Sequence, residues 1–143
     1  MDDAPPVTSD HAHDGTPRGE ELLDALLVGL VDAVVVIDSF GEILRVSDSV
    51  HSMFGWAPAD LVRENIRVLM PEPYRSEHDG YLAKYRETGR TWILGTVREF
   101  DVVRNDGVIV PCELSVSRLD VESPRGPLFC GTFRDISERR RAR

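Results

Sequence analysis

Residues 33–46 read AVVVIDSFGEILRV, and this stretch decides the fold. Its two ends, 33–38 and 43–46, are short runs rich in β-branched or aliphatic side chains. The SFGE segment between them, at 39–42, contains the glycine expected of a turn. Two such runs separated by about four residues predict a β-hairpin, so we expect an antiparallel sheet to start here.

The segment before the hairpin predicts a helix preceded by a polar tail. Leucines recur at helical spacing between residues 20 and 30 and predict one amphipathic helix with an apolar seam. Residues 1–20 are polar, acidic and proline-rich, so we expect a disordered tail that cannot bury enough apolar surface to fold. His11 and His13 lie in this tail, and we interpret them as solvated rather than as a metal site.

The middle of the chain predicts several short helices and one longer one. Ser47 and Asp48 are candidate N-caps for a short helix that Gly55 can end. A longer helix is expected from about residue 75 to residue 88, followed by Gly89. Its inward stripe is predicted to contain His78, Tyr81, Leu82 and Tyr85.

The last third predicts three strands, at 92–103, 108–119 and 128–136, with Asn105-Asp106-Gly107 as a hairpin turn. Together with the first hairpin they describe an α+β domain, a five-stranded antiparallel sheet with helices on one face. We therefore expect a tail at 1–20, a domain at 21–137 and the start of a connector helix at 138–143.

Composition limits the classes of function. The chain has 143 residues and a net charge of −8, from 25 acidic and 17 basic residues, which disfavours nucleic-acid binding. No apolar run approaches the roughly 20 residues that cross a bilayer, so we expect no membrane insertion. The N-terminus lacks a signal-peptide layout, and two cysteines without a CxxC spacing are expected to be structural thiols in the cytoplasm. Hydrolase, nucleotide-binding and metalloprotease motifs are missing, so we do not expect an enzyme.

Four sequence motifs resemble the PAS sensor domains. They are Asp38-Ser39-Phe40-Gly41 after the first strand, Phe54-Gly55-Trp56 after the first short helix, Arg104-Asn105-Asp106-Gly107 at the hairpin, and Phe133-Arg134-Asp135-Ile136-Ser137 at the exit. The resemblance extends over about residues 20–137 and implies a PAS fold. It also implies a signalling helix that leaves the domain toward an output module such as a histidine kinase.

A closer resemblance lies in residues 65–89, NIRVLMPEPYRSEHDGYLAKYRETG. This segment resembles the haem-binding PAS domain of the oxygen-sensing FixL histidine kinases. The resemblance implies haem b as the cofactor, His78 as the iron ligand, and oxygen or another diatomic gas as the signal. Tyr81, on the same predicted stripe as His78, is included among the expected cofactor-binding residues.

The same resemblance assigns the other expected site residues. Arg98 matches the distal arginine that responds to bound oxygen, and Ile93, Leu114 and Val116 match the apolar distal wall. Lys84 and Trp92 fall where that family has basic residues for the haem propionates. Lys84 keeps the charge without the guanidinium fork, whereas Trp92 can offer only one indole N–H.

Other interpretations of these residues remain open. His78 fits a hydrogen-bonded core histidine, and Arg98 fits a cross-strand ion pair with a residue such as Glu113. A flavin photoadduct is excluded because Ile66 stands where the reactive cysteine would be. The alternative to a gas sensor is a cofactor-free PAS module for dimerisation, protein interaction or an unidentified small molecule. In either case we expect a homodimer through the N-terminal helix, the exit segment, or both.

Overall fold

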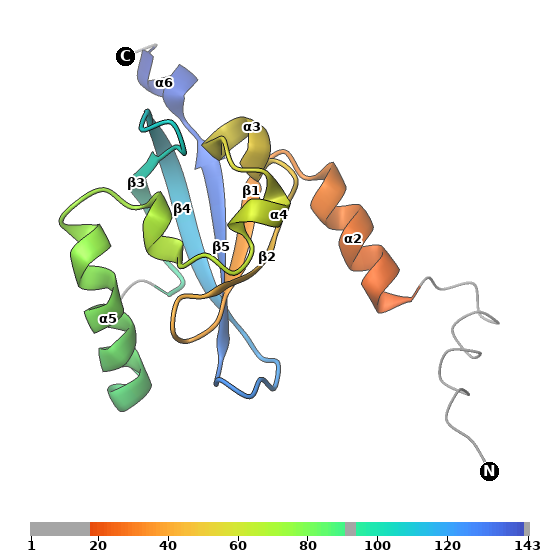
Figure 1. Cartoon of the computed structure of the whole chain (residues 1–143), viewed down its shortest axis with the longest axis vertical. Helices are drawn as coiled ribbons and strands as arrows, with labels where there is room; N and C mark the ends of the chain where they lie inside the picture. The colour runs from red at the N-terminus through yellow and green to blue at the C-terminus, as the bar shows by residue number, and fades with distance from the viewer. Residues whose placement is uncertain (1–17, 91–93, 142–143) are drawn as a thin grey trace.

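A computed structural model describes residues 18–90 and 94–141. Its centre is a five-stranded antiparallel sheet in the order β2-β1-β5-β4-β3. The strands are β1 (Ala33–Ile37), β2 (Ile43–Val46), β3 (Val97–Val103), β4 (Ile109–Leu119) and β5 (Leu128–Asp135). The predicted fold class is therefore confirmed (Figure 1).

The hairpin expected at residues 33–46 forms as β1 and β2, with Val35 opposite Val46. Strand β1 also pairs with β5 along its whole length, which places β1 between β2 and the central strand β5. Strand β3 begins at Val97, later than the predicted residue 92. Gly95, at φ +78°, interrupts the extended chain, and the residue before it makes only an isolated bridge to Val116.

The helices are α2 (Gly19–Gly29), α3 (Val50–Phe54), α4 (Pro58–Leu61), the 3₁₀ helix η1 (Ile66–Leu69), α5 (Tyr74–Thr88) and α6 (Ser137–Arg141). In Figure 1, α3, α4 and α5 are on one side of the sheet, whereas α2 lies outward from the β1–β2 region. No helix in the described residues is long and apolar enough to span a bilayer.

The core lies between the sheet and the short helices. Phe54 of α3 packs edge-on against Phe133 of β5, with ring centroids 5.3 Å apart. Ala33, Ile43, Leu61 and several other apolar side chains complete this core. Burial of this apolar surface is the main force that holds α3, α4 and η1 on the sheet.

Helix α2 forms as expected but does not bury its apolar seam. No residue of α2 is buried, and Leu22 and Leu26 are 48% and 53% exposed. The helix is attached to the domain mainly by polar contacts, in which Arg45 pairs with Glu20 and Asp24. Most of the predicted tail, residues 1–17 with His11 and His13, lies outside the described residues.

Candidate functional site

Helix α5 holds the predicted iron ligand, and local interactions define both of its ends. The Glu72 carboxylate accepts hydrogen bonds from the backbone N–H and the hydroxyl of Ser76, at 3.1 and 2.8 Å. Gly89 ends the helix at φ +71°, and its N–H donates to the Tyr85 carbonyl at 2.7 Å. The helix predicted to end before Gly89 is therefore confirmed.

Two aromatic contacts define which face of α5 meets the sheet. The Tyr74 ring lies 5.4 Å from that of Phe100 on β3, and the Tyr85 ring lies 5.1 Å from that of Phe129 on β5. His78 follows Tyr74 by four positions and precedes Tyr85 by seven, so all three share one helical face. His78 therefore belongs to the stripe that faces the sheet.

The His78 imidazole is half-buried and has an unsatisfied polar atom. Its Nδ1 is buried without a hydrogen-bond partner among the residues described. Burial lowers the pKa of His78, the neighbouring Asp79 carboxylate opposes this shift, and Arg67 adds to it. The ring is thus kept neutral, which is the form that binds a metal.

Asp79 links this part of α5 to η1 through an ion pair with Arg67. Both side chains are partly exposed, so the pair acts more as a positional restraint than as a source of stability. It fixes the turn of α5 that contains His78 against the short helix that precedes it in the chain.

The strand register places three of the expected residues on the sheet face that α5 covers. Arg98 is opposite Leu114, and Leu114 is opposite the core residue Phe133. Val116 is opposite Gly131 on the same face. A Cβ on Gly131 would lie 3.3 Å from the Phe133 ring and 3.5 Å from Leu114, so only glycine leaves this space open.

Other expected residues lie away from this face or outside the description. Tyr81 is 53% exposed, and its hydroxyl donates to Glu77 at 2.9 Å, so its predicted place on the inward stripe is wrong. The inward face of α5 is centred on His78, Leu82 and Tyr85, and Tyr81 falls at the edge of this face, where its side chain reaches solvent. Lys84 is exposed on α5, and the side chain of Arg98 is also exposed. Trp92 and Ile93 lie outside the described residues.

The described residues supply a candidate iron ligand and an apolar wall that fit a haem. A neutral imidazole with an orphaned buried nitrogen is suited to an iron ligand, and the half-buried Leu114 and Val116 are suited to an apolar wall. On the propionate side, Lys84 offers a cation from the exposed surface of α5.

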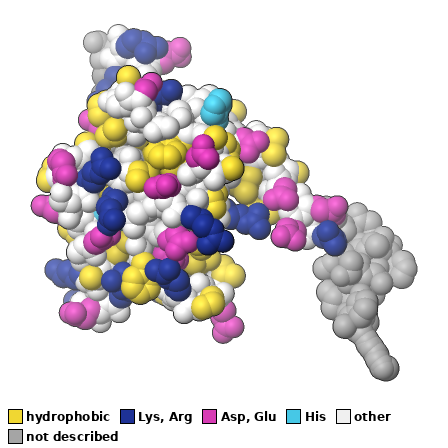
Figure 2. Space-filling view, viewed as in Figure 1, with side chains coloured by type: hydrophobic (Ala, Val, Ile, Leu, Met, Phe, Trp, Pro, Cys, Tyr) yellow, Lys and Arg dark blue, Asp and Glu magenta, His cyan; other side chains and the backbone are white. Residues whose placement is uncertain are grey.

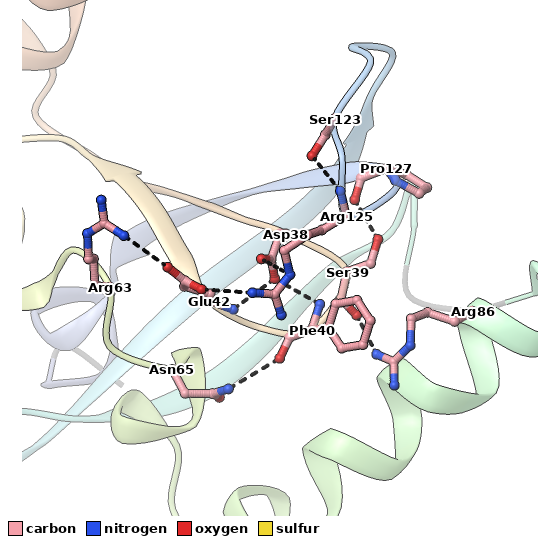
Figure 3. A network of polar contacts seen from close by, with 10 residues as sticks. All are labelled: Asp38, Ser39, Phe40, Glu42, Arg63, Asn65, Arg86, Ser123, Arg125 and Pro127. Atoms are coloured by element: carbon pink, nitrogen blue, oxygen red, sulfur yellow. Dashed lines mark hydrogen bonds and ion pairs between the residues drawn. The ribbon is translucent and has the colours of Figure 1, made fainter.

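Sequence reasoning missed a polar network around the β1–β2 turn, which Figure 3 shows. The ring of Phe40 lies between the guanidinium groups of Arg86 from α5 and Arg125 from the β4–β5 loop. No periodicity links these three residues, because they come from three separate elements. The one sequence signal near this network is the motif at residues 38–41, which indicates the fold and not the contact.

Comparisons with known proteins agree with this geometry. A family profile described as "PAS fold" matches residues 21–136, most of the chain. This chain belongs to the PAS family. The PAS domain from an HTR-like protein of Haloarcula marismortui superposes with a TM-score of 0.65 and 19% identity, covering 90% of this chain and 98% of that one.

Two curated relatives of this PAS domain are sensors. Sensor protein FixL of Bradyrhizobium diazoefficiens is 37% identical over 119 residues, which are 83% of this chain and 23% of FixL. Oxygen sensor protein DosP of Escherichia coli is 24% identical over 114 residues, 80% of this chain and 14% of DosP. The chain thus spans less than a quarter of either relative, and it is a sensory PAS domain with no catalytic domain in the described residues.

Proposed function

We propose that this PAS domain binds haem b through His78 and senses oxygen or another diatomic gas. The observation that favours this function is the buried, unpartnered nitrogen of a neutral imidazole on the sheet-facing stripe of α5. The resemblance of residues 65–89 to haem-binding PAS domains, together with the similarity to FixL and DosP, supports the same ligand. Bound haem supplies an iron centre with one open face for a gas.

Each candidate residue has a role that follows from its chemistry. His78 offers a neutral nitrogen to the metal, and Leu114 and Val116 exclude water from the opposite wall. Arg98, on the same sheet face, is a multiple hydrogen-bond donor suited to a partially negative ligand. Lys84 is a candidate partner for a propionate, and Tyr81, Trp92 and Ile93 remain candidates for cofactor contacts.

The output follows from the class of domain. PAS sensors pass their signal to an output domain, and we infer that this one acts on a module such as a histidine kinase, in the cytoplasm. Helix α6 leaves the domain at Ser137, where the Asp135 carboxylate accepts hydrogen bonds from the Ser137 backbone N–H and hydroxyl. This cap ties the start of the exit helix to the end of β5.

The test is a visible absorption spectrum of protein produced with added haem precursor, reduced under nitrogen and then exposed to oxygen. We expect a stoichiometric haem band that shifts reversibly with oxygen, and its loss in His78→Ala. His51→Ala is the matched control, because His51 is an exposed histidine on α3. A parent protein that stays colourless with excess haem, or a His78→Ala variant that holds as much haem as the parent, contradicts the assignment.

A second candidate function is a cofactor-free dimerisation module, and the exposed seam of α2 favours it. Leu22, Leu23 and Leu26 present apolar surface that a second copy of the domain would cover. Sedimentation of the parent and of Leu26→Glu distinguishes this role. A parent that dimerises without haem and a variant that is monomeric would support the module, whereas a monomeric parent contradicts it.

A further inference from the structure

The turn between β1 and β2 is rigid and buried at its base. Asp38 is 2% exposed, and its Oδ1 accepts hydrogen bonds from the backbone N–H groups of Phe40 and Glu42, at 2.8 and 3.0 Å. Gly41 is at φ +90°, a conformation that glycine adopts without strain. The turn therefore holds Phe40 in one place, with its side chain 42% exposed.

Two arginines from different elements lie against the Phe40 ring (Figure 3). The Arg125 guanidinium carbon is 4.5 Å from the ring centroid, and the group pairs with Asp38 at 3.2 Å and with Glu42 at 3.1 Å. Its charge is thus neutralised by the turn itself. Arg125 fixes one side of the ring and leaves the other side to α5.

Arg86 of α5 occupies that other side. Its guanidinium carbon lies 3.9 Å from the Phe40 centroid, and its Nη1 donates to the Ser39 carbonyl at 2.6 Å. Arg86 forms no ion pair with an acidic residue of the described chain, so the ring and this carbonyl are its partners there. Cation–π attraction and a charged donor on a carbonyl both restrain the position of the guanidinium.

Helix α5 depends on such discrete contacts, because it buries little. Only Tyr85 is buried among its 15 residues. Tyr74 and the Arg67–Asp79 pair hold its first half, whereas Tyr85 and Arg86 hold its second half. Helix α5 is short enough to move as one rod, so the loss of a contact in the second half tilts the helix and also displaces His78 in the first half, without disturbing the core.

We propose that Arg86, held by Phe40 and Ser39, is a positioning residue for His78. By fixing the second half of α5 to the β1–β2 turn, Arg86 keeps the imidazole at its depth and angle against the sheet. The role toward iron rests on the proposed function, whereas the role in placing the imidazole is a property of the protein alone. The face of α5 that contains His78 is thereby connected to the turn that links β1 and β2.

The first arm of the test uses the haem-free protein. Diethyl pyrocarbonate modifies accessible imidazoles, so we compare the modification rate of His78 with that of the exposed His51 in the same sample. Arg86→Gln and Phe40→Leu are expected to raise the His78 rate about three- to tenfold and leave the His51 rate unchanged. In the same two variants, amide hydrogen exchange in the second half of α5 is expected to become faster.

The controls separate positioning from a general loss of stability. Arg90→Gln removes the same charge just beyond α5, and Phe40→Tyr keeps the aromatic ring, so both are expected to match the parent. The double variant Arg86→Gln/Phe40→Leu is expected to show no more than the larger single effect, because both changes break the same contact. Equal His78 rates in Arg86→Gln and Arg90→Gln overturn the proposal.

The second arm uses the haem-loaded protein. We expect Arg86→Gln to release haem about three- to tenfold faster to an excess of a high-affinity acceptor, and to shift the iron–histidine stretching band. Phe40→Tyr is expected to keep the parent band. An unchanged band and release rate overturn the positioning role toward iron. A parent that holds no haem overturns the proposed function, and the first arm still decides whether Arg86 places His78.

Discussion

At the scale of single residues, His78 destabilises the haem-free domain. A buried nitrogen without a partner has lost its hydrogen bond to water and gained none in return. Replacement by an apolar side chain removes that penalty. We predict that His78→Leu raises the free energy of unfolding of the haem-free protein at pH 7.5 by about 1 kcal/mol, measured by urea denaturation. A variant less stable than the parent would contradict this account.

The same burial makes the stability of the haem-free protein depend on pH. Burial lowers the pKa of His78 in the folded state below its ordinary value of 6.5. At a pH between this lowered pKa and 6.5, the unfolded chain binds the proton and the folded chain does not. Stability is then lost as the pH falls below about 6.5 toward the folded-state pKa. We predict a steeper loss between pH 7.5 and 5.5 for the parent than for His78→Leu. Parallel losses would show that His78 does not contribute.

The two thiols are predicted to be unreactive in the folded state. Burial, reinforced by nearby carboxylates of Asp135 and Asp101, raises the pKa of Cys112 to about 12, and burial also raises the pKa of Cys130. The thiolate is the reactive form, so maleimide labelling at pH 8 is expected to be slow until urea unfolds the chain. Cys130, which is partly exposed, is expected to react before the fully buried Cys112. Folded protein that labels at the unfolded rate would contradict this prediction.

At the scale of elements, two glycines next to the site have opposite requirements. Gly80 lies inside α5 with nothing within 4 Å of an added Cβ, whereas a Cβ on Gly41 would lie 3.0 Å from Asn65 and 3.2 Å from Leu82. We predict that Gly80→Ala stabilises the domain by about 1 kcal/mol through helix propensity. Gly41→Ala is expected to destabilise it by about 1–2 kcal/mol because of its positive φ. Urea denaturation of both variants tests this, and equal effects would contradict it.

Prediction from sequence succeeded for elements defined by local signals and failed for contacts between distant ones. Residues 33–46 specified their own hairpin, and Gly89 specified the end of α5. The spacing over α5 gave the correct face for His78, Leu82 and Tyr85 but could not show that Tyr81, at the edge of that face, is exposed. The contact of Arg86 with Phe40 joins residues 46 positions apart, and nothing in either local sequence pairs them.

At the scale of the whole molecule, β3 lies between the candidate site and the exit. Its side chains alternate, so Arg98 faces the α5 side while Glu99 and Asp101 face outward. On that outer face Glu99 is directly opposite Glu113 of β4, an arrangement that is unfavourable without a cation. Arg140 of α6 pairs with Glu99 at 2.7 Å and Asp101 at 3.8 Å.

Arg139 completes this contact by pairing with Glu113 at 3.5 Å, so the exit helix rests on the outer face of β3 and β4 through charge. A shift of β3 at Arg98 would therefore move the residues that hold α6. Acidic and basic side chains are interspersed over the face seen in Figure 2, with no large area of one sign. Local ion pairs therefore contribute more to the attachment of α6 than a long-range electrostatic field does.

The attachment of α6 is predicted to be easily broken without unfolding the domain. Arg140 and its partners are partly exposed, so Arg140→Gln is expected to change the free energy of unfolding by less than about 1 kcal/mol. Amide exchange in α6 is expected to rise in this variant, and also in the parent at about 1 M salt, where such pairs are screened. Arg141→Gln is the control, because Arg141 is an exposed arginine of the same helix. If α6 exchanged equally in both variants, the ion pairs would not hold the helix.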